Sequence, residues 1–425
     1  MNELLLLIGL LFPCWYGYRR SVSAGRVEIN HVTTFTFGFL FYWMTPLAVR
    51  IWISRVDFPM ASVWIDLFRP QLIEPYALSC VVLYFCFAAG DALAIRILRG
   101  SSATAGPKIP RPALSLVTLA GFLLMLYSAY FERAYLFRPA APGTMRVGVA
   151  RGAVTSCMVL LATVALMFTI EHPEVSWRKR LLSPYFLAPM TGASVMILLG
   201  SRLYVASILL MFAIYQTNLR RRFKLKTVIA AALVFALIFG AIGTWREGSS
   251  ATGAYFNVFL EPMLGSLSLV HHLRYKGIAW INEPTQLISD FKNLIPTVLM
   301  PDKFKALKKP DAYRPLGGLH SFVSFNLNFG IVGTAIVLFL LPIGFRYLKS
   351  RFPRTLPATF YIMCTAWLGF TFFRDAFSIS IVKAMFEDSI LIPTAIVGFG
   401  SLLRAACVPS TDTGDVAGNL QAEML

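Results

Sequence analysis

The stretch from residue 327 to 345, LNFGIVGTAIVLFLLPIGF, contains no charged residue. Its length is close to the roughly 20 apolar residues that a helix needs to cross the hydrocarbon core of a bilayer. Basic residues follow it directly: Arg346, Lys349, Arg351 and Arg354. Because short cytoplasmic loops are enriched in Lys and Arg, this stretch predicts a membrane-spanning helix whose carboxyl end faces the cytoplasm.

Comparable apolar runs recur along the whole chain. Its 425 residues are 57% hydrophobic, with a mean hydropathy of +0.65, whereas soluble domains have roughly 45–50% apolar residues. The runs predict an all-α, polytopic transmembrane bundle of about 11 (10 to 14) spans. The expected spans are residues 3–18, 32–52, 73–95, 112–131, 150–170, 182–199, 202–217, 227–244, 327–345, 357–373 and 388–406. We expect one domain over residues 1–408 and a disordered cytoplasmic tail over residues 409–425.

The charges between the runs predict the orientation. Short basic segments follow every odd-numbered span: Arg19, Arg20 and Arg26; Arg96, Arg99, Lys108 and Arg111; Arg178, Lys179 and Arg180; Arg220, Arg221, Arg222, Lys224 and Lys226; and the group after residue 345. These loops are expected in the cytoplasm. The amino terminus and the long loop 245–326 would then lie outside, on the periplasmic face.

The long loop 245–326 is too long to be a simple connection and is therefore expected to be functional. It is rich in basic residues: Arg246, Arg274, Lys276, Lys292, Lys303, Lys305, Lys308, Lys309 and Arg314. Two interpretations stay open, namely attraction to an anionic ligand such as a lipid pyrophosphate or acidic glycan, and attraction to anionic lipid headgroups. An amphipathic stretch at 254–270 is compatible with either one.

Two candidate sites contain arginine at the outer ends of spans. Arg202 follows Gly200-Ser201 between spans six and seven, and Arg246 precedes Glu247 where span eight ends. An arginine in such a position is a functional candidate, and its planar donors suit phosphate oxygens. The structural alternatives are a side chain that reaches the headgroups and a local ion pair at the interface.

Two further candidate sites lie near the end of the long loop and after span ten. His320 lies in Gly317-Gly318-Leu319-His320-Ser321, and Arg374 precedes Asp375 after span ten. A histidine can transfer a proton near neutral pH, although a hydrogen-bonded structural histidine is the common alternative. Arg374 and Asp375 could equally form a structural ion pair. The other histidines, His31, His172, His271 and His272, lack a comparable sequence setting.

Several classes of protein are disfavoured. The six cysteines lie within or at the ends of apolar runs without a metal-ligand spacing, so no disulfide, metal site or cofactor is predicted. The formal charge of +18 is spread between spans, which argues against nucleic acid as a partner. No P-loop, GxSxG, HExxH or DxD-type cluster is present. A metal-independent reaction on a phosphorylated lipid remains compatible.

Together, Gly-Ser-Arg at 200–202, Gly-Gly-Leu-His-Ser at 317–321, Asn-Phe-Gly at 328–330 and Phe-Arg-Asp at 373–375 resemble motifs of bacterial oligosaccharide repeat-unit polymerases. These are the Wzy-type O-antigen and exopolysaccharide polymerases of the inner membrane, similar in fold to other lipid-dependent glycosyltransferases. The resemblance covers most of the chain in layout. Polymerases of this type often have both termini in the cytoplasm, whereas the charges of this chain predict an amino terminus outside.

The resemblance implies a glycosyltransferase that joins undecaprenyl-pyrophosphate-linked oligosaccharides, with membrane lipids and a chain-length regulator as further partners. Charge develops on the leaving pyrophosphate, which Arg202, Arg246 and Arg374 are expected to stabilise. His320 is the expected base, with Glu247 in reserve. The alternatives are a flippase or transporter for lipid-linked glycans and an acyl- or phospho-transferase. A transporter needs polar residues along its path, and only Asp91 stands out well inside a span.

Overall fold

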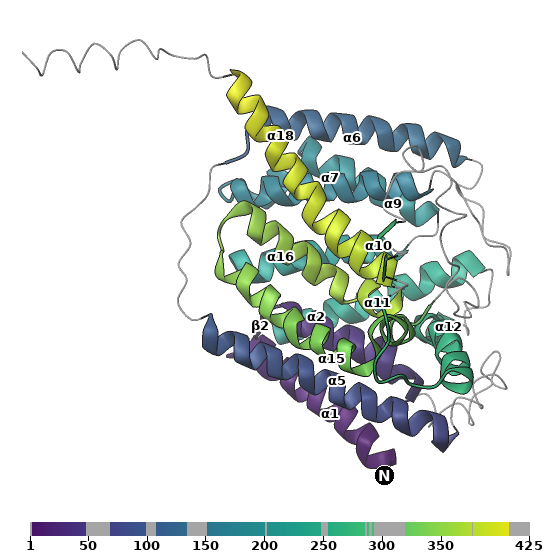
Figure 1. The fold of residues 1–425 in the computed structure, drawn as a ribbon. Helices are drawn as coiled ribbons and strands as arrows, with labels where there is room; N and C mark the ends of the chain where they lie inside the picture. The colour runs from purple at the N-terminus through teal and green to yellow at the C-terminus, as the bar shows by residue number, and fades with distance from the viewer. Residues whose placement is uncertain are drawn as a thin grey trace, which may run out of the picture.

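The computed structural model describes residues 2–47, 69–98, 108–133, 151–199, 202–247, 254–284, 287–288, 291–292, 319–375 and 377–407. These residues are predominantly helical (Figure 1). Five helices within these described ranges are long and apolar enough to cross a membrane: Gln71–Ile97, Arg111–Phe131, Gly152–Glu171, Ser321–Ser350 and Ser380–Cys407. Three shorter apolar helices accompany them, Pro184–Leu198, Leu225–Phe235 and Thr355–Leu368. The chain is therefore an all-α membrane protein.

The helices lie side by side, with α6 and α7 at the top and α1 and α5 at the bottom of Figure 1. The helices of the amino-terminal half are α1 (Asn2–Ser21), α2 (His31–Gly38), α5 (Pro70–Ile97), α6 (Arg111–Phe131), α7 (Arg151–Glu171), α8 (Trp177–Leu181), α9 (Pro184–Leu198) and α10 (Arg202–Tyr215). Those of the other half are α11 (Leu225–Glu247), α12 (Ala254–Tyr275), α15 (Ser321–Ser350), α16 (Thr355–Leu368), α17 (Thr371–Arg374) and α18 (Ile392–Cys407). Three π-helical stretches continue some of them: η1 (Phe39–Met44), η4 (Gln216–Arg220) and η7 (Ser378–Leu391).

The main apolar core fills the space between α1, α2, α5, α7, α15 and α16. Its centre is the close contact of α5 with α15, where a side chain at Gly90 would put its Cβ 2.0 Å from the Phe339 carbonyl oxygen. A small residue at a helix contact lets two backbones approach closely, as is common in membrane bundles. Gly90 therefore fixes α15 against α5.

Several basic segments expected in the cytoplasm meet at one end of the bundle. A three-stranded antiparallel sheet of β1 (Val22–Ser23), β2 (Arg26–Val27) and β3 (Phe223–Lys224) joins the segment after α1 to the one before α11. The Glu28 carboxylate pairs with Arg222 and with Lys349 near the end of α15. The segments that follow α1, η4 and α15 therefore share one end, as the charge pattern requires.

Asp91 of α5 lies near this end and is fully buried. Its carboxylate accepts hydrogen bonds from Nε of Arg20 and Nε of Arg346, both at 2.8 Å, and from the Tyr16 hydroxyl at 2.9 Å. Nε2 of His31 lies 3.2 Å from Oδ1 of this carboxylate, the oxygen that Arg346 also contacts. This polar residue inside a span thus joins α1, α2, α5 and α15, rather than lining a polar path through the described bundle.

Two helices extend beyond the spans expected from the sequence. α15 begins at Ser321 rather than 327. The His320 carbonyl accepts the first hydrogen bonds of this helix, from the N–H groups of Val323 and Ser324. The last span begins before Lys383, Glu387 and Asp388, because η7 carries the helix back to Ser378. The long loop 245–326 contains a helix of its own, α12, over the stretch expected to be amphipathic. Much of that loop and the tail 409–425 lie outside the described residues.

Candidate functional site

The site is built where α12 runs beside the first part of α15, at the end of α15 opposite Arg346. The Ser268 hydroxyl accepts a hydrogen bond from the His320 backbone N–H at 2.9 Å. One turn further along α12, Nε2 of His272 lies 3.1 Å from Oδ1 of Asn326. The paired positions advance in the same direction on both segments, so α12 and α15 run in parallel here.

Asn326 is the centre of the site. Its Oδ1 accepts the Ala279 N–H at 3.2 Å, and its Nδ2 donates to the Ala279 carbonyl at 3.0 Å. Since the two bonds to one backbone unit have opposite polarity, they fix which end of the amide is oxygen. Asn282 then donates from Nδ2 to the Asn326 carbonyl at 2.8 Å. The amide is therefore rigid and its orientation is defined.

The chain after α12 is attached to a kink in α15. Gly277, at φ +68°, ends α12 in the left-handed conformation typical of helix caps. Gly330 has φ +65° and ψ −172° and interrupts α15. The N–H groups of Ile331 and Val332, which lose their helical partners there, donate instead to the Ala279 and Trp280 carbonyls at 3.0 and 3.1 Å. The kink thus holds the segment that follows α12 against α15.

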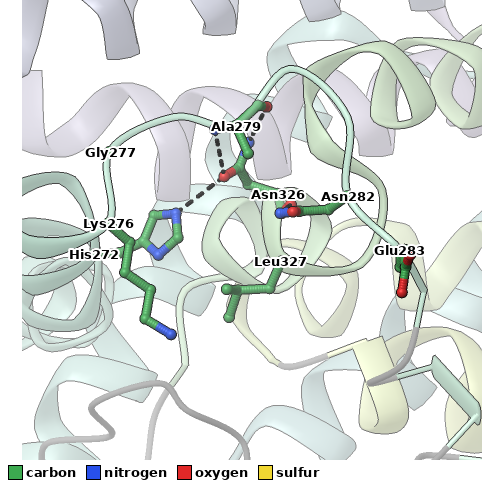
Figure 2. A pocket seen from close by; sticks show the side chains of 8 residues that line it. All are labelled: His272, Lys276, Gly277, Ala279, Asn282, Glu283, Asn326 and Leu327. Atoms are coloured by element: carbon green, nitrogen blue, oxygen red, sulfur yellow. Dashed lines mark hydrogen bonds between the residues drawn. The ribbon is translucent and has the colours of Figure 1, made fainter.

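A pocket of about 420 Å³ opens between these segments, within the roughly 300–1,000 Å³ of small-molecule sites. Figure 2 displays its lining side chains, with a dashed line from the His272 ring to the Asn326 amide. The lining comprises His272, Lys276, Gly277, Ala279, Asn282, Glu283, Asn326 and Leu327. It combines a cation, a carboxylate, two amides and an imidazole, a set suited to a polyhydroxyl ligand that carries an anionic group.

The contact with Asn326 sets the proton position on His272. Because Oδ1 only accepts, Nε2 of His272 must carry the proton, and in the neutral ring Nδ1 is left as an acceptor. Burial lowers the pKa of His272, and the charges of Lys276 and His271 lower it further, against the hydrogen bond to Asn326, which raises it. The imidazole is therefore neutral at pH 7 and can accept a proton at Nδ1.

His320, the base expected from the sequence, is enclosed beside this pocket rather than in its lining. Its Nε2 lies 3.3 Å from the Tyr42 carbonyl, and its ring lies near the rings of Trp43 and Tyr76, with centroids 6.4 and 6.3 Å away. Burial lowers the pKa of His320 to about 4. Nδ1 is buried without a hydrogen-bond partner among the described residues, so His320 also has a proton acceptor.

Arg374 and His320 are connected by a short chain of contacts between their sequence neighbours. The Ser321 hydroxyl donates to the Phe373 carbonyl at 2.7 Å, which ties α17 to the start of α15. Arg374 is partly exposed and pairs with Asp375, with 3.5 Å between Nη1 and Oδ1, as in the structural alternative considered for it. The structure thus brings two of the predicted site residues, His320 and Arg374, to the same end of the bundle.

The other predicted residues can be placed only by their backbones. Arg202 begins α10, while Arg246 and Glu247 end α11, and the side chains of all three lie outside the described part of the structure. Gly200, Ser201, Gly317 and Gly318 lie outside the described residues altogether. Within the described ranges, no group of three or more His, Cys, Asp or Glu residues could hold a metal ion.

Comparisons with protein-family models, curated proteins and solved structures find no match for this chain. Its site must therefore be interpreted from its own chemistry. The sequence interpretation missed His272, because its role depends on an amide 54 residues further along the chain. One available signal was the i, i+4 spacing of Ser268 and His272, which puts these two polar side chains on one side of α12.

Proposed function

We propose that this protein is a glycosyltransferase that joins undecaprenyl-pyrophosphate-linked oligosaccharide repeat units at the periplasmic face of the bacterial inner membrane. The proposal combines the resemblance to repeat-unit polymerases with one observation, the buried His272 that Asn326 holds in the lining of a polar pocket. A base with a defined proton acceptor is what a metal-independent transfer to a sugar hydroxyl requires.

In the proposed reaction, a hydroxyl oxygen of the acceptor sugar attacks the anomeric carbon of the donor repeat unit. The bond between that carbon and the pyrophosphate oxygen breaks, and undecaprenyl pyrophosphate leaves with the electron pair. The hydroxyl proton passes to Nδ1 of His272. Asn282, Glu283 and the Asn326 amide supply the polar surroundings that hold an acceptor sugar near the base.

The leaving pyrophosphate needs fixed positive charge. Lys276 supplies one cation at the pocket. Arg202, Arg246 and Arg374 remain the proposed further cations, since their planar donors match phosphate oxygens better than an ammonium does. His320, adjacent to the site, is retained as the rival base, and Glu247 as the reserve. The chain-length regulator remains a proposed partner.

A flippase for the same lipid-linked glycan is the second candidate, because it would also need cations at this end of the bundle. It is less favoured, since the buried Asp91 has its acceptor sites filled by Arg20 and Arg346. The fixed ion pairs of Asp91 suit a static support better than a moving polar path.

The direct test is incubation of the purified protein, in detergent or nanodiscs, with an undecaprenyl-pyrophosphate-linked repeat unit. A polymerase gives a ladder of lipid-linked products on a gel and releases undecaprenyl pyrophosphate. A parallel assay in proteoliposomes measures transfer of the same lipid between leaflets. Transfer without any ladder would replace the polymerase with the flippase.

A further inference from the structure

The kink at Gly330 divides α15 into two parts with different surroundings. After it, Val332, Ile336, Leu340 and Tyr347 form an exposed stripe along one side of the helix. Before it, no large apolar side chain of α15 is exposed, and those from Ser321 to Asn326 are buried by other elements. Because the chain spans a membrane, the exposed stripe is its lipid-facing surface, and this surface begins at the kink.

The length of the helix leads to the same division. The 30 residues of α15 would rise about 45 Å at 1.5 Å per residue, more than the hydrocarbon core of about 30 Å. The uncharged part after the kink, from Ile331 to Phe345, rises about 22 Å on the same basis. It therefore crosses most of the core by itself, and the kink lies close to the boundary between hydrocarbon and headgroups.

Trp280 and Ile281 lie directly against this boundary. These residues are 75% and 76% exposed, although neither belongs to one of the spanning helices described above. The Trp280 carbonyl accepts the Val332 N–H, and a Cβ at Gly330 would lie 2.5 Å from that carbonyl oxygen. The two side chains thus extend the lipid-facing stripe at its end, where tryptophan is enriched in membrane proteins.

The residues on either side of this pair are polar and line the pocket. Lys276 precedes it, and Asn282 and Glu283 follow it. An apolar pair at the hydrocarbon boundary, with a cation and amides beside it, matches the two halves of an anionic lipid: an acyl or prenyl chain and a phosphorylated headgroup.

We propose that Trp280 and Ile281 form an interfacial anchor that inserts into the bilayer and holds the pocket at headgroup depth, so that its ligand arrives from the lipid leaflet. The insertion stands on the geometry of α15, and only the identity of the arriving lipid rests on the proposed function. Lys276 meets the headgroup charge, while Trp280 and Ile281 contact the chain of the lipid.

The depth of the anchor can be measured by fluorescence quenching in proteoliposomes. The three cysteines that are not buried, Cys14, Cys86 and Cys407, are replaced by serine, and a bimane label is attached at Ile281→Cys. Quenching is compared between lipids with a nitroxide near the headgroup end of the chain, lipids with one near the chain terminus, and aqueous iodide. Leu340→Cys, in the middle of the stripe, is the deep reference, and Glu283→Cys, at the pocket, is the aqueous reference.

The anchor predicts that the Ile281 label is quenched mainly by the shallow nitroxide, Leu340 mainly by the deep one, and Glu283 mainly by iodide. If iodide quenches the Ile281 label as strongly as the Glu283 label, and neither nitroxide affects it, the anchor is wrong. Quenching does not depend on turnover. Shallow quenching at Ile281 in a protein that forms no polymer would therefore refute the proposed function and still support the anchor.

Discussion

Asn326 of α15 holds His272 of α12 in one tautomer, with Oδ1 of the amide 3.1 Å from Nε2 of the ring. The amide cannot rotate to offer its NH₂ group instead, because both of its ends are bonded to Ala279. Orientation of an imidazole by a fixed acceptor is how proteins prepare a histidine for proton transfer. The direction of the free Nδ1 lone pair therefore depends on Asn326.

Replacing Asn326 by leucine should remove this orientation while keeping a similar volume. We expect kcat to fall by part of the roughly 100- to 10,000-fold that a general base contributes, with a smaller change in KM. Asn328→Leu is the matched control, since Asn328 is a buried amide on the same helix that bonds Ser324 and does not line the pocket. Equal losses of kcat in both variants would reduce Asn326 to a packing role.

The pH dependence of the reaction should report His272. As the base must be deprotonated, activity is retained above its pKa and lost as the pH falls through it. Since burial and Lys276 lower that pKa, the acidic limb of kcat should lie below 6.5. Lys276→Gln removes a nearby positive charge and should move the limb upward. A limb that stays in place in this variant, measured at saturating substrate, would contradict the assignment of the titrating group to His272.

Gly330→Ala tests the kink. The added Cβ would lie 2.5 Å from the Trp280 carbonyl oxygen, at a φ of +65° that alanine rarely adopts. Forcing such a residue costs about 1–3 kcal/mol, which should detach the segment from α15 rather than unfold the bundle. Hydrogen exchange should increase at Ile331 and Val332, whose N–H groups bond that segment. Gly344→Ala is the control, because its added Cβ meets nothing within 4 Å.

Asp91→Ala should destabilise the whole bundle. The substitution leaves two arginines, Arg20 and Arg346, without the buried carboxylate that joins them. Removing one partner of a buried ion pair costs about 3–5 kcal/mol. A clear decrease in Tm in detergent is therefore expected. Glu174→Ala, which removes an exposed carboxylate beside His172, should leave Tm unchanged, and an Asp91→Ala protein with wild-type Tm would contradict the supporting role.

Hydropathy predicted helices at many of the apolar runs, because burial in lipid requires long uncharged runs, but only five helices of the described residues are long and apolar enough to cross a membrane, against about 11 expected spans. The run expected at 112–131 is α6, and the one at 150–170 is α7. The pocket was not predictable in the same way. It depends on the kink at Gly330 and on a contact between α12 and α15, and neither leaves a periodic pattern in the sequence. The positive φ of Gly330 is what ends the first part of α15.

The most direct test of the account is the single-turnover rate of glycosyl transfer from a lipid-linked repeat unit by His272→Ala, with binding of the same lipid measured in parallel. His271→Ala is the matched control, since its ring packs near Tyr275 and does not line the pocket. We predict that His272→Ala loses roughly 100- to 10,000-fold in rate, binds the lipid as before and forms no ladder, while His271→Ala stays near wild type. A full ladder from His272→Ala together with an inactive His320→Ala would contradict the account and move the base to His320.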